Sequence, residues 1–236
     1  MDNLLNFPLL VLAISLVTLS VAEWIGISVP RSLEAREQDD FNLISGATLT
    51  LLGLIIGFTF SMAISRYDQR KNYEEAEANA IGTEYVRADF LPLVDAARVR
   101  ALLKTYLAQR ELFYGAHDAI ELRQINAATE QLQTALWSAV RGPAMAQPTP
   151  VMALVVSGMN DVLNSQGYTQ AAWWNRIPMA AWGLMAAIAL FCHVLIGHGL
   201  RRAEERSKLL IVLPLLVSTS FFLIADIDSP RGGIIR

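Results

Sequence analysis

The stretch GFTFSMAISRYDQR, residues 57–70, passes from an apolar, membrane-type sequence into a charged one without a turn residue. Its first half is uncharged, whereas its second half carries Arg66 and Arg70. Glycine and proline, which often end helices, are absent from residues 59–81. The stretch therefore predicts one continuous helix that leaves the lipid and runs on into water.

The composition of the whole chain is that of a membrane protein. Of the 236 residues, 53% are hydrophobic and only 17% are charged, with a formal net charge of −3. Soluble domains usually carry about 25% charged residues. The small net charge and the lack of a long basic run exclude a nucleic-acid groove. The single cysteine, Cys192, lies in an apolar stretch, which predicts a buried thiol and excludes an internal disulfide.

Four uncharged windows have the length of a membrane-spanning helix. They hold 20, 25, 24 and 17 residues, at positions 3–22, 41–65, 177–200 and 209–225. A spanning helix needs about 20 apolar residues, with roughly 17 to 25 acceptable. The first window lacks the basic start and the cleavage site of a signal peptide, so we interpret it as a retained helix. Pro214 lies in the shortest window, which we expect to be kinked or extended by neighbouring residues.

The sequence between the two pairs of windows predicts packed helices. Residues 66–176 hold 11 Lys and Arg against 12 Asp and Glu, with regular apolar spacing and no useful β alternation. We expect one helix that begins after Pro92 and ends at Gly115, one that stops at Gly142-Pro143, and one that begins at Thr149-Pro150, with residues 142–150 as a hinge. The expected buried faces are Leu102, Tyr106, Leu107, Arg110 and Phe113 in the first helix, and Leu122, Ile125, Leu132, Leu136 and Val140 in the second.

The predicted fold class is therefore all-α, an integral membrane protein with two plus two transmembrane helices around a helical insert. The expected division is residues 1–66 for the first helix pair, 67–171 for the helical region, 172–228 for the second pair, and 229–236 for a tail. Charged flanks do not set the orientation, because a cytoplasmic amino terminus leaves six Lys or Arg on each side. Trp24, Trp173, Trp174 and Trp182 are expected as interfacial anchors.

The second window carries two neighbouring stripes at four-residue spacing. The first consists of small residues, Gly53, Gly57, Ser61 and Ser65. Such a stripe lets helices approach closely in lipid. The second is bulkier and consists of Thr50, Leu54, Phe58 and Met62. Two interpretations stay open: the small stripe packs on a neighbour while the bulky stripe faces a central space, or a four-helix bundle buries both.

The second window and its exit resemble the bestrophins, and more closely the bacterial bestrophin-like membrane family. The resemblance rests on Gly57-Phe58 and on the exit Arg66-Tyr67-Asp68-x-Arg70. The segments NAIGTEYVRADFLP, residues 79–92, and DSPRGG, residues 228–233, add weaker support. The arrangement of two plus two helices extends the resemblance over the full chain. Gln69 departs from the family pattern, in which Arg and then Trp follow the Tyr-Asp pair.

Bestrophins are pentameric anion channels whose second helices surround the pore with a hydrophobic neck. The resemblance implies a homopentamer in a bacterial inner membrane, with both termini and the middle region in the cytoplasm. It implies a neck at Thr50, Leu54, Phe58 and Met62, where a narrow apolar ring gates by dewetting. Arg66, Arg70 and Lys71 are expected at the inner mouth, where converging cations concentrate anions, unless they pair with Glu74, Glu75 or lipid phosphates. The expected partners are further copies of the chain, membrane lipid and inorganic anions.

No residue pattern predicts catalysis, a metal or a cofactor. The three histidines lack metal-ligand spacing with a carboxylate, and no nucleophile or phosphate-loop motif occurs. Asp226 and Asp228 replace the dense acidic cluster that binds calcium in animal bestrophins, so calcium gating is not carried over. We expect these two acids to reach water or to pair with Arg231, with an ion relay as the alternative.

A second class of function stays open. In this alternative, the protein is a non-conducting, membrane-anchored helical scaffold or stress sensor, and the helix that contains residues 57–70 transmits the state of a partner. Oligomer stoichiometry separates the two classes.

Overall fold

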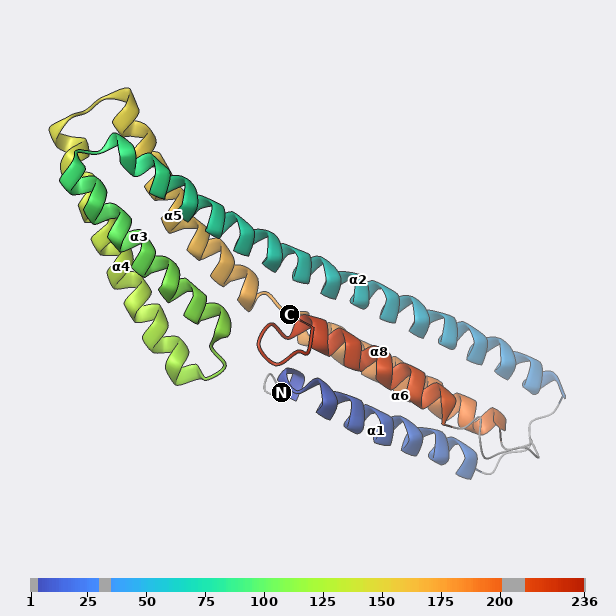
Figure 1. Cartoon of the computed structure of the whole chain (residues 1–236). Helices are drawn as coiled ribbons and strands as arrows, with labels where there is room; N and C mark the ends of the chain where they lie inside the picture. The colour runs from blue at the N-terminus through green and yellow to red at the C-terminus, as the bar shows by residue number, and fades with distance from the viewer. Residues whose placement is uncertain (1–3, 30–34, 201–210, 236) are drawn as a thin grey trace. The chain divides into compact units, whose positions relative to one another are not determined.

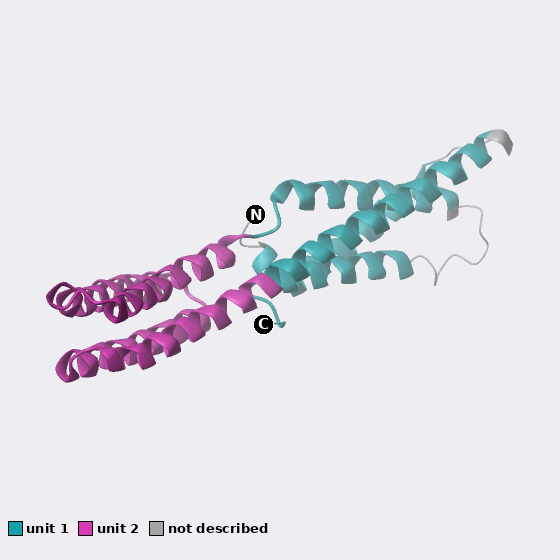
Figure 2. Ribbon diagram, turned by 90° about the horizontal axis from the view of Figure 1, so that it is seen from above, with its two compact units in different colours: residues 1–67, 176–236 teal, residues 68–175 magenta. Residues whose placement is uncertain are grey.

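The computed structural model describes residues 4–29, 35–200 and 211–235. All regular structure in these ranges is helical, so the predicted all-α class is confirmed (Figure 1). The chain forms two compact units, residues 1–67 with 176–236 as unit 1 and residues 68–175 as unit 2 (Figure 2). Helix α2 (Ala35–Arg87) belongs to both units and runs through residues 57–70 without interruption. This confirms the predicted continuous helix.

Unit 1 contains α1 (Pro8–Ser28), the first part of α2, α6 (Met179–Leu200) and α8 (Val212–Asp228), preceded by the short 3₁₀ helix η1 (Leu4–Asn6). Its apolar core joins Leu52 of α2 to Met185 of α6 and Phe221 of α8. Helix α1 approaches α6 closely at Gly26 and Gly197. A Cβ atom at either glycine would overlap a backbone carbonyl of the other helix, so only glycine permits this approach.

Three helices of the described residues are long and apolar enough to cross a membrane. They are Pro8–Ser28, the apolar part of Glu37–Phe90, and the apolar part of Pro150–Gly199, which contains α6. Helix α8 has 17 residues and overlaps the fourth predicted window, residues 209–225, with an offset of three residues. A fourth span remains a prediction.

Unit 2 contains the rest of α2, η2 (Ala88–Phe90), α3 (Leu93–Gly115), α4 (Ala119–Ala146) and α5 (Pro150–Trp174). The predicted limits at Gly115 and Pro150 are confirmed. The Thr149 hydroxyl accepts a hydrogen bond from the Met152 backbone N–H at 3.2 Å, as expected of an N-cap. Most residues of the two predicted faces are buried, namely Tyr106, Arg110, Phe113, Ile125, Leu136 and Val140. Three more are partly buried and pack against the cores, namely Leu102, Leu122 and Leu132.

Three expectations for individual residues are wrong. Helix α4 does not stop at Gly142-Pro143 but continues to Ala146, so residues 142–150 do not form a hinge. Pro143 lacks one backbone donor, but it lies in the last turn, where its carbonyl still accepts from Gln147 at 3.0 Å. Leu107 is 38% exposed, although the periodicity placed it in the core. Trp182 is buried in unit 1 and is no interfacial anchor.

Candidate functional site

Within unit 1, α2 packs one face and leaves the opposite face open. Leu52, Thr59 and Ala63 are buried, and Leu52 and Ala63 join the core formed by α6 and α8. These three positions are seven and four residues apart, which places them on one side of a helix with 3.6 residues per turn. The other side of α2 is therefore exposed among the residues of unit 1 that the structure describes.

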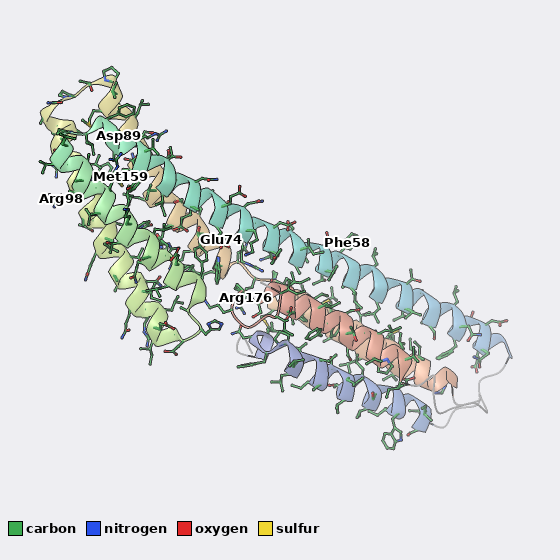
Figure 3. All side chains as sticks on the ribbon, in the orientation of Figure 1. Phe58, Glu74, Asp89, Arg98, Met159 and Arg176 are labelled. Carbon is green, nitrogen blue, oxygen red and sulfur yellow. The ribbon has the colours of Figure 1, made fainter. Side chains whose placement is uncertain are left out.

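The predicted neck residues lie on this open face. Leu54 is 53% exposed and Phe58, labelled in Figure 3, is 63% exposed. Thr50 and Met62 are also exposed, and the Thr50 hydroxyl donates to the Gly46 carbonyl at 2.9 Å within its own helix. The bulky stripe is thus apolar in character along its whole length. Its role in a pore remains a prediction.

The small stripe lies beside it and is equally open. A Cβ atom built at Gly53 or Gly57 meets nothing within 4 Å, and Ser61 and Ser65 are exposed. The described helices of one chain therefore bury neither stripe, contrary to the second interpretation of the sequence pattern. Close approach of another helix is sterically possible along the entire row.

The predicted inner-mouth cations differ from one another in environment. Arg66, in unit 1, is half-buried. In unit 2, the Arg70 side chain is buried, whereas Lys71 is exposed and its ammonium lies 3.3 Å from the Glu74 carboxylate. Lys71 thus shows the pairing that the sequence offered as an alternative. The pore role of all three remains a prediction.

Sequence analysis missed a row of buried charges on α2. Arg70, Glu77 and Glu84 are seven residues apart, and all three are buried in unit 2. Seven residues make about two turns of a helix, so side chains at this spacing lie on the same side of it. The seven-residue spacing was present in the sequence, but the sequence analysis did not use it.

Glu77 forms a buried ion pair with Arg110 of α3. The Arg110 Nε donates to Glu77 Oε1, Arg110 Nη2 donates to Oε2 at 3.3 Å, and the Tyr114 hydroxyl donates to Oε2 at 2.7 Å. The guanidinium also lies 4.3 Å from the centre of the Phe113 ring. Burial, and then the negative charge of Glu77, raise the pKa of Tyr114 well above its usual value, which keeps the phenol protonated as a donor.

Glu84 has no such partner. Its side chain is fully buried, and neither carboxyl oxygen has a hydrogen-bond partner among the described residues. It lies against Gly158 of α5, where a Cβ atom would overlap both the Glu84 carboxyl and the Arg87 guanidinium. Burial raises the pKa of Glu84 to about 8; the charge of Arg87 opposes this rise and that of Asp161 adds to it. Glu84 is therefore a buried acid that favours its neutral form.

The two acids at the end of α8 accept hydrogen bonds from neighbouring backbone N–H groups. Asp226 accepts hydrogen bonds from the backbone N–H groups of Ile234 at 2.6 Å and Ile235 at 2.9 Å. Both carboxyl oxygens of Asp228 lie 3.2 Å from the Ile177 N–H. The two acids are buried, so they do not reach water, which was one of the two expected outcomes; the pairing with Arg231 remains a prediction. The local backbone donors stabilise both acids inside the protein.

Gly233 makes this arrangement possible, because a Cβ atom there would overlap the Asp226 carbonyl. In the ranges that the structure describes, no three His, Cys, Asp or Glu residues are grouped so that they could hold a metal ion. Cys192 is buried and free, as predicted. The site with the clearest functional geometry is therefore the open face of α2.

Comparison with known proteins gives one match. A family model described as Bestrophin-like domain matches residues 13–236. Neither the curated proteins nor the solved structures give a match. The matched residues include α2, α6, α8 and the whole of unit 2.

Proposed function

The chain belongs to the bestrophin-like family, and from this premise we propose that it forms a homo-oligomeric ion channel with α2 around the pore. We propose a pentamer that conducts chloride-type anions in a bacterial inner membrane. Both termini and unit 2 lie in the cytoplasm in this proposal. The partners are other copies of the chain, membrane lipid and inorganic anions.

The observation that carries the proposal is the open face of α2. An apolar helix that shows two uncovered stripes needs a neighbour for each, or lipid. The small stripe fits a closely packed helix of the next copy, because nothing lies within 4 Å of a Cβ at Gly53 or Gly57. The bulky stripe then faces the axis of the oligomer.

This orientation gives a physical gate. Leu54 and Phe58 of several copies form an apolar ring, and an ion with its water crosses such a ring only when it widens. Lys71 and Arg66 of several copies add their positive charge near the cytoplasmic end and raise the local anion concentration. The Glu74 carboxylate, 3.3 Å from the Lys71 ammonium, offsets part of the Lys71 charge.

The experiment measures stoichiometry and conduction on the same preparation. The full-length chain is purified in detergent, its mass is determined by native mass spectrometry, and chloride efflux is followed from liposomes that contain it. A pentamer with efflux above that of empty liposomes supports the channel. A monomer or dimer without efflux contradicts it and favours the scaffold or sensor.

A further inference from the structure

Unit 1 contains an apolar groove between α1 and α6 that the channel proposal does not use. Its volume is about 480 Å³, and its lining includes Leu5, Ile14, Thr18, Trp182, Ala186 and Leu190. The groove is open at Gly183 and Ala186 of α6, because neither residue has a bulky side chain to fill the space beside α1. The two hydroxyls in the lining, those of Ser15 and Thr18, donate to carbonyls of their own helix.

The Trp182 indole N–H in the lining has no hydrogen-bond partner among the described residues, but a bound water needs about two to four polar partners. An apolar cavity of this kind stays dry, and it binds apolar molecules instead. Because α1 and α6 are both apolar enough to cross a membrane, the molecules that surround the groove are lipid chains or apolar protein side chains.

The dimensions favour a lipid chain. The part of α6 that lines the groove, residues 179–190, rises by about 16 Å at 1.5 Å per residue. One leaflet of a bilayer has a hydrocarbon depth of about 15 Å, half of the roughly 30 Å core. The apolar lining is therefore about one leaflet long.

A cation lies at the polar end of the groove. Arg176 precedes α6, and its Nη1 donates to Asn6 Oδ1 at 2.5 Å; Asn6 follows the lining residue Leu5. Among the described residues, no carboxylate forms an ion pair with Arg176. Asp228, which accepts from the N–H of Ile177 next to Arg176, is buried.

The helix ends add positive potential at the same place. Helices α1 and α6 both begin there, and the first residues of α1 have no side-chain cap. The N-terminus of a helix carries a partial positive charge that favours phosphate. Helix α8 ends there, but backbone donors satisfy its two terminal acids.

We infer that this groove binds one acyl chain of an anionic phospholipid, whose phosphate lies at Arg176. The apolar walls take the chain along one leaflet, and the guanidinium with the two helix N-termini selects the charged headgroup. The inference concerns lipid binding by each chain and does not depend on whether the oligomer conducts ions.

Lipid binding is measured on the full-length chain in detergent by native mass spectrometry. Phosphatidylglycerol and phosphatidylcholine with identical acyl chains are added separately, and the number and affinity of bound lipids are compared. We expect phosphatidylglycerol to bind at least about tenfold more tightly, because both lipids offer a phosphate to Arg176 but only phosphatidylcholine also carries a cation, which the guanidinium and the helix N-termini repel. Equal affinity for the two lipids overturns the assignment of the headgroup to Arg176.

Matched variants locate the site. Ala186→Phe fills the groove, whereas Ala187→Phe places the same ring on the next, exposed residue outside the lining. We expect about tenfold weaker phosphatidylglycerol binding for Ala186→Phe and parent-like binding for Ala187→Phe. Gly183→Leu is a second groove-filling variant, and no atom lies within 4 Å of its Cβ position. The inference is overturned if both groove variants bind phosphatidylglycerol as tightly as the parent. It is also overturned if they change only the number of chains per oligomer.

The headgroup is tested by Arg176→Gln. We expect this variant to bind phosphatidylglycerol more weakly and to lose the preference for it over phosphatidylcholine. Arg141→Gln, an exposed arginine of unit 2, is the control for loss of one charge and keeps the preference. An unchanged preference in Arg176→Gln contradicts the proposed phosphate position.

Discussion

The buried acid on α2 makes the pH dependence of stability predictable. Glu84 has a pKa of about 8 in the folded protein, against an ordinary value of 4.5, mainly because burial disfavours its charged form. A raised pKa means that folding binds a proton. The stability associated with neutral Glu84 is fully present below pH 4.5, falls as the pH rises, and is lost once the pH passes about 8.

The size of the effect follows from the two pKa values. Each pH unit between them changes the free energy of unfolding by about 1.36 kcal/mol. At pH 7 the unfavourable burial of Glu84 therefore amounts to about 3 kcal/mol, and at pH 5 to less than about 1 kcal/mol. Glu84→Gln keeps the shape and removes the titration. It should stabilise the protein at pH 7 by about 3 kcal/mol, or roughly 6 to 12 °C in Tm.

The assay is thermal unfolding of the full-length chain in detergent between pH 5 and 9, followed by circular dichroism. Glu75→Gln on the same helix is the control, because Glu75 is exposed and its replacement should leave the pH profile unchanged. The parent should lose Tm relative to Glu84→Gln steadily from pH 5 to 8. Parallel profiles for the parent and Glu84→Gln would refute the reasoning that burial sets the pKa.

Three further predictions concern packing. Gly158→Ala should lower the free energy of unfolding by about 1 to 3 kcal/mol, because its Cβ overlaps the buried acid and a guanidinium, whereas Gly167→Ala on the same helix meets nothing and should raise it by up to about 1 kcal/mol in the same melts. Arg110→Met should destabilise by about 3 to 5 kcal/mol, since it leaves Glu77 buried without its ion-pair partner; adding Glu77→Gln should recover part of the loss, and no recovery would contradict the pairing argument. Gly57→Leu should reduce the number of copies per oligomer in native mass spectrometry, and an unchanged mass would move the helix contact away from the small stripe.

Local patterns in the sequence predicted most of the helices. The lack of breakers in residues 59–81 predicted the continuity of α2, and Thr149-Pro150 predicted the start of α5. The stop at Gly142-Pro143 failed because a proline in the last turn of a helix removes only one hydrogen bond. Local signals describe what a segment prefers, and the packing around it decides where the helix ends.

The buried charges show why the rest could not be predicted. Arg70, Glu77 and Glu84 have a visible spacing of seven residues, but Glu77 pairs with an arginine 33 positions away. The burial of Glu84 depends on Gly158 of another helix, which leaves room for its carboxyl group. Likewise, the apolar groove results from α1 passing the small residues of α6, and spacing along one helix does not give that contact.

The central claim is that the bulky stripe of α2 faces the pore. It is tested most directly by chloride efflux from liposomes for Leu54→Ala with Phe58→Ala, compared with Leu184→Ala with Phe191→Ala on α6. The control residues are similarly exposed, at 53% and 57% against 53% and 63%, and they lie outside the groove lining. Widening an apolar neck lowers the barrier to ions, so the first pair should raise efflux several-fold and the control pair should leave it at the parent level. Equal efflux in the two double variants would contradict the account.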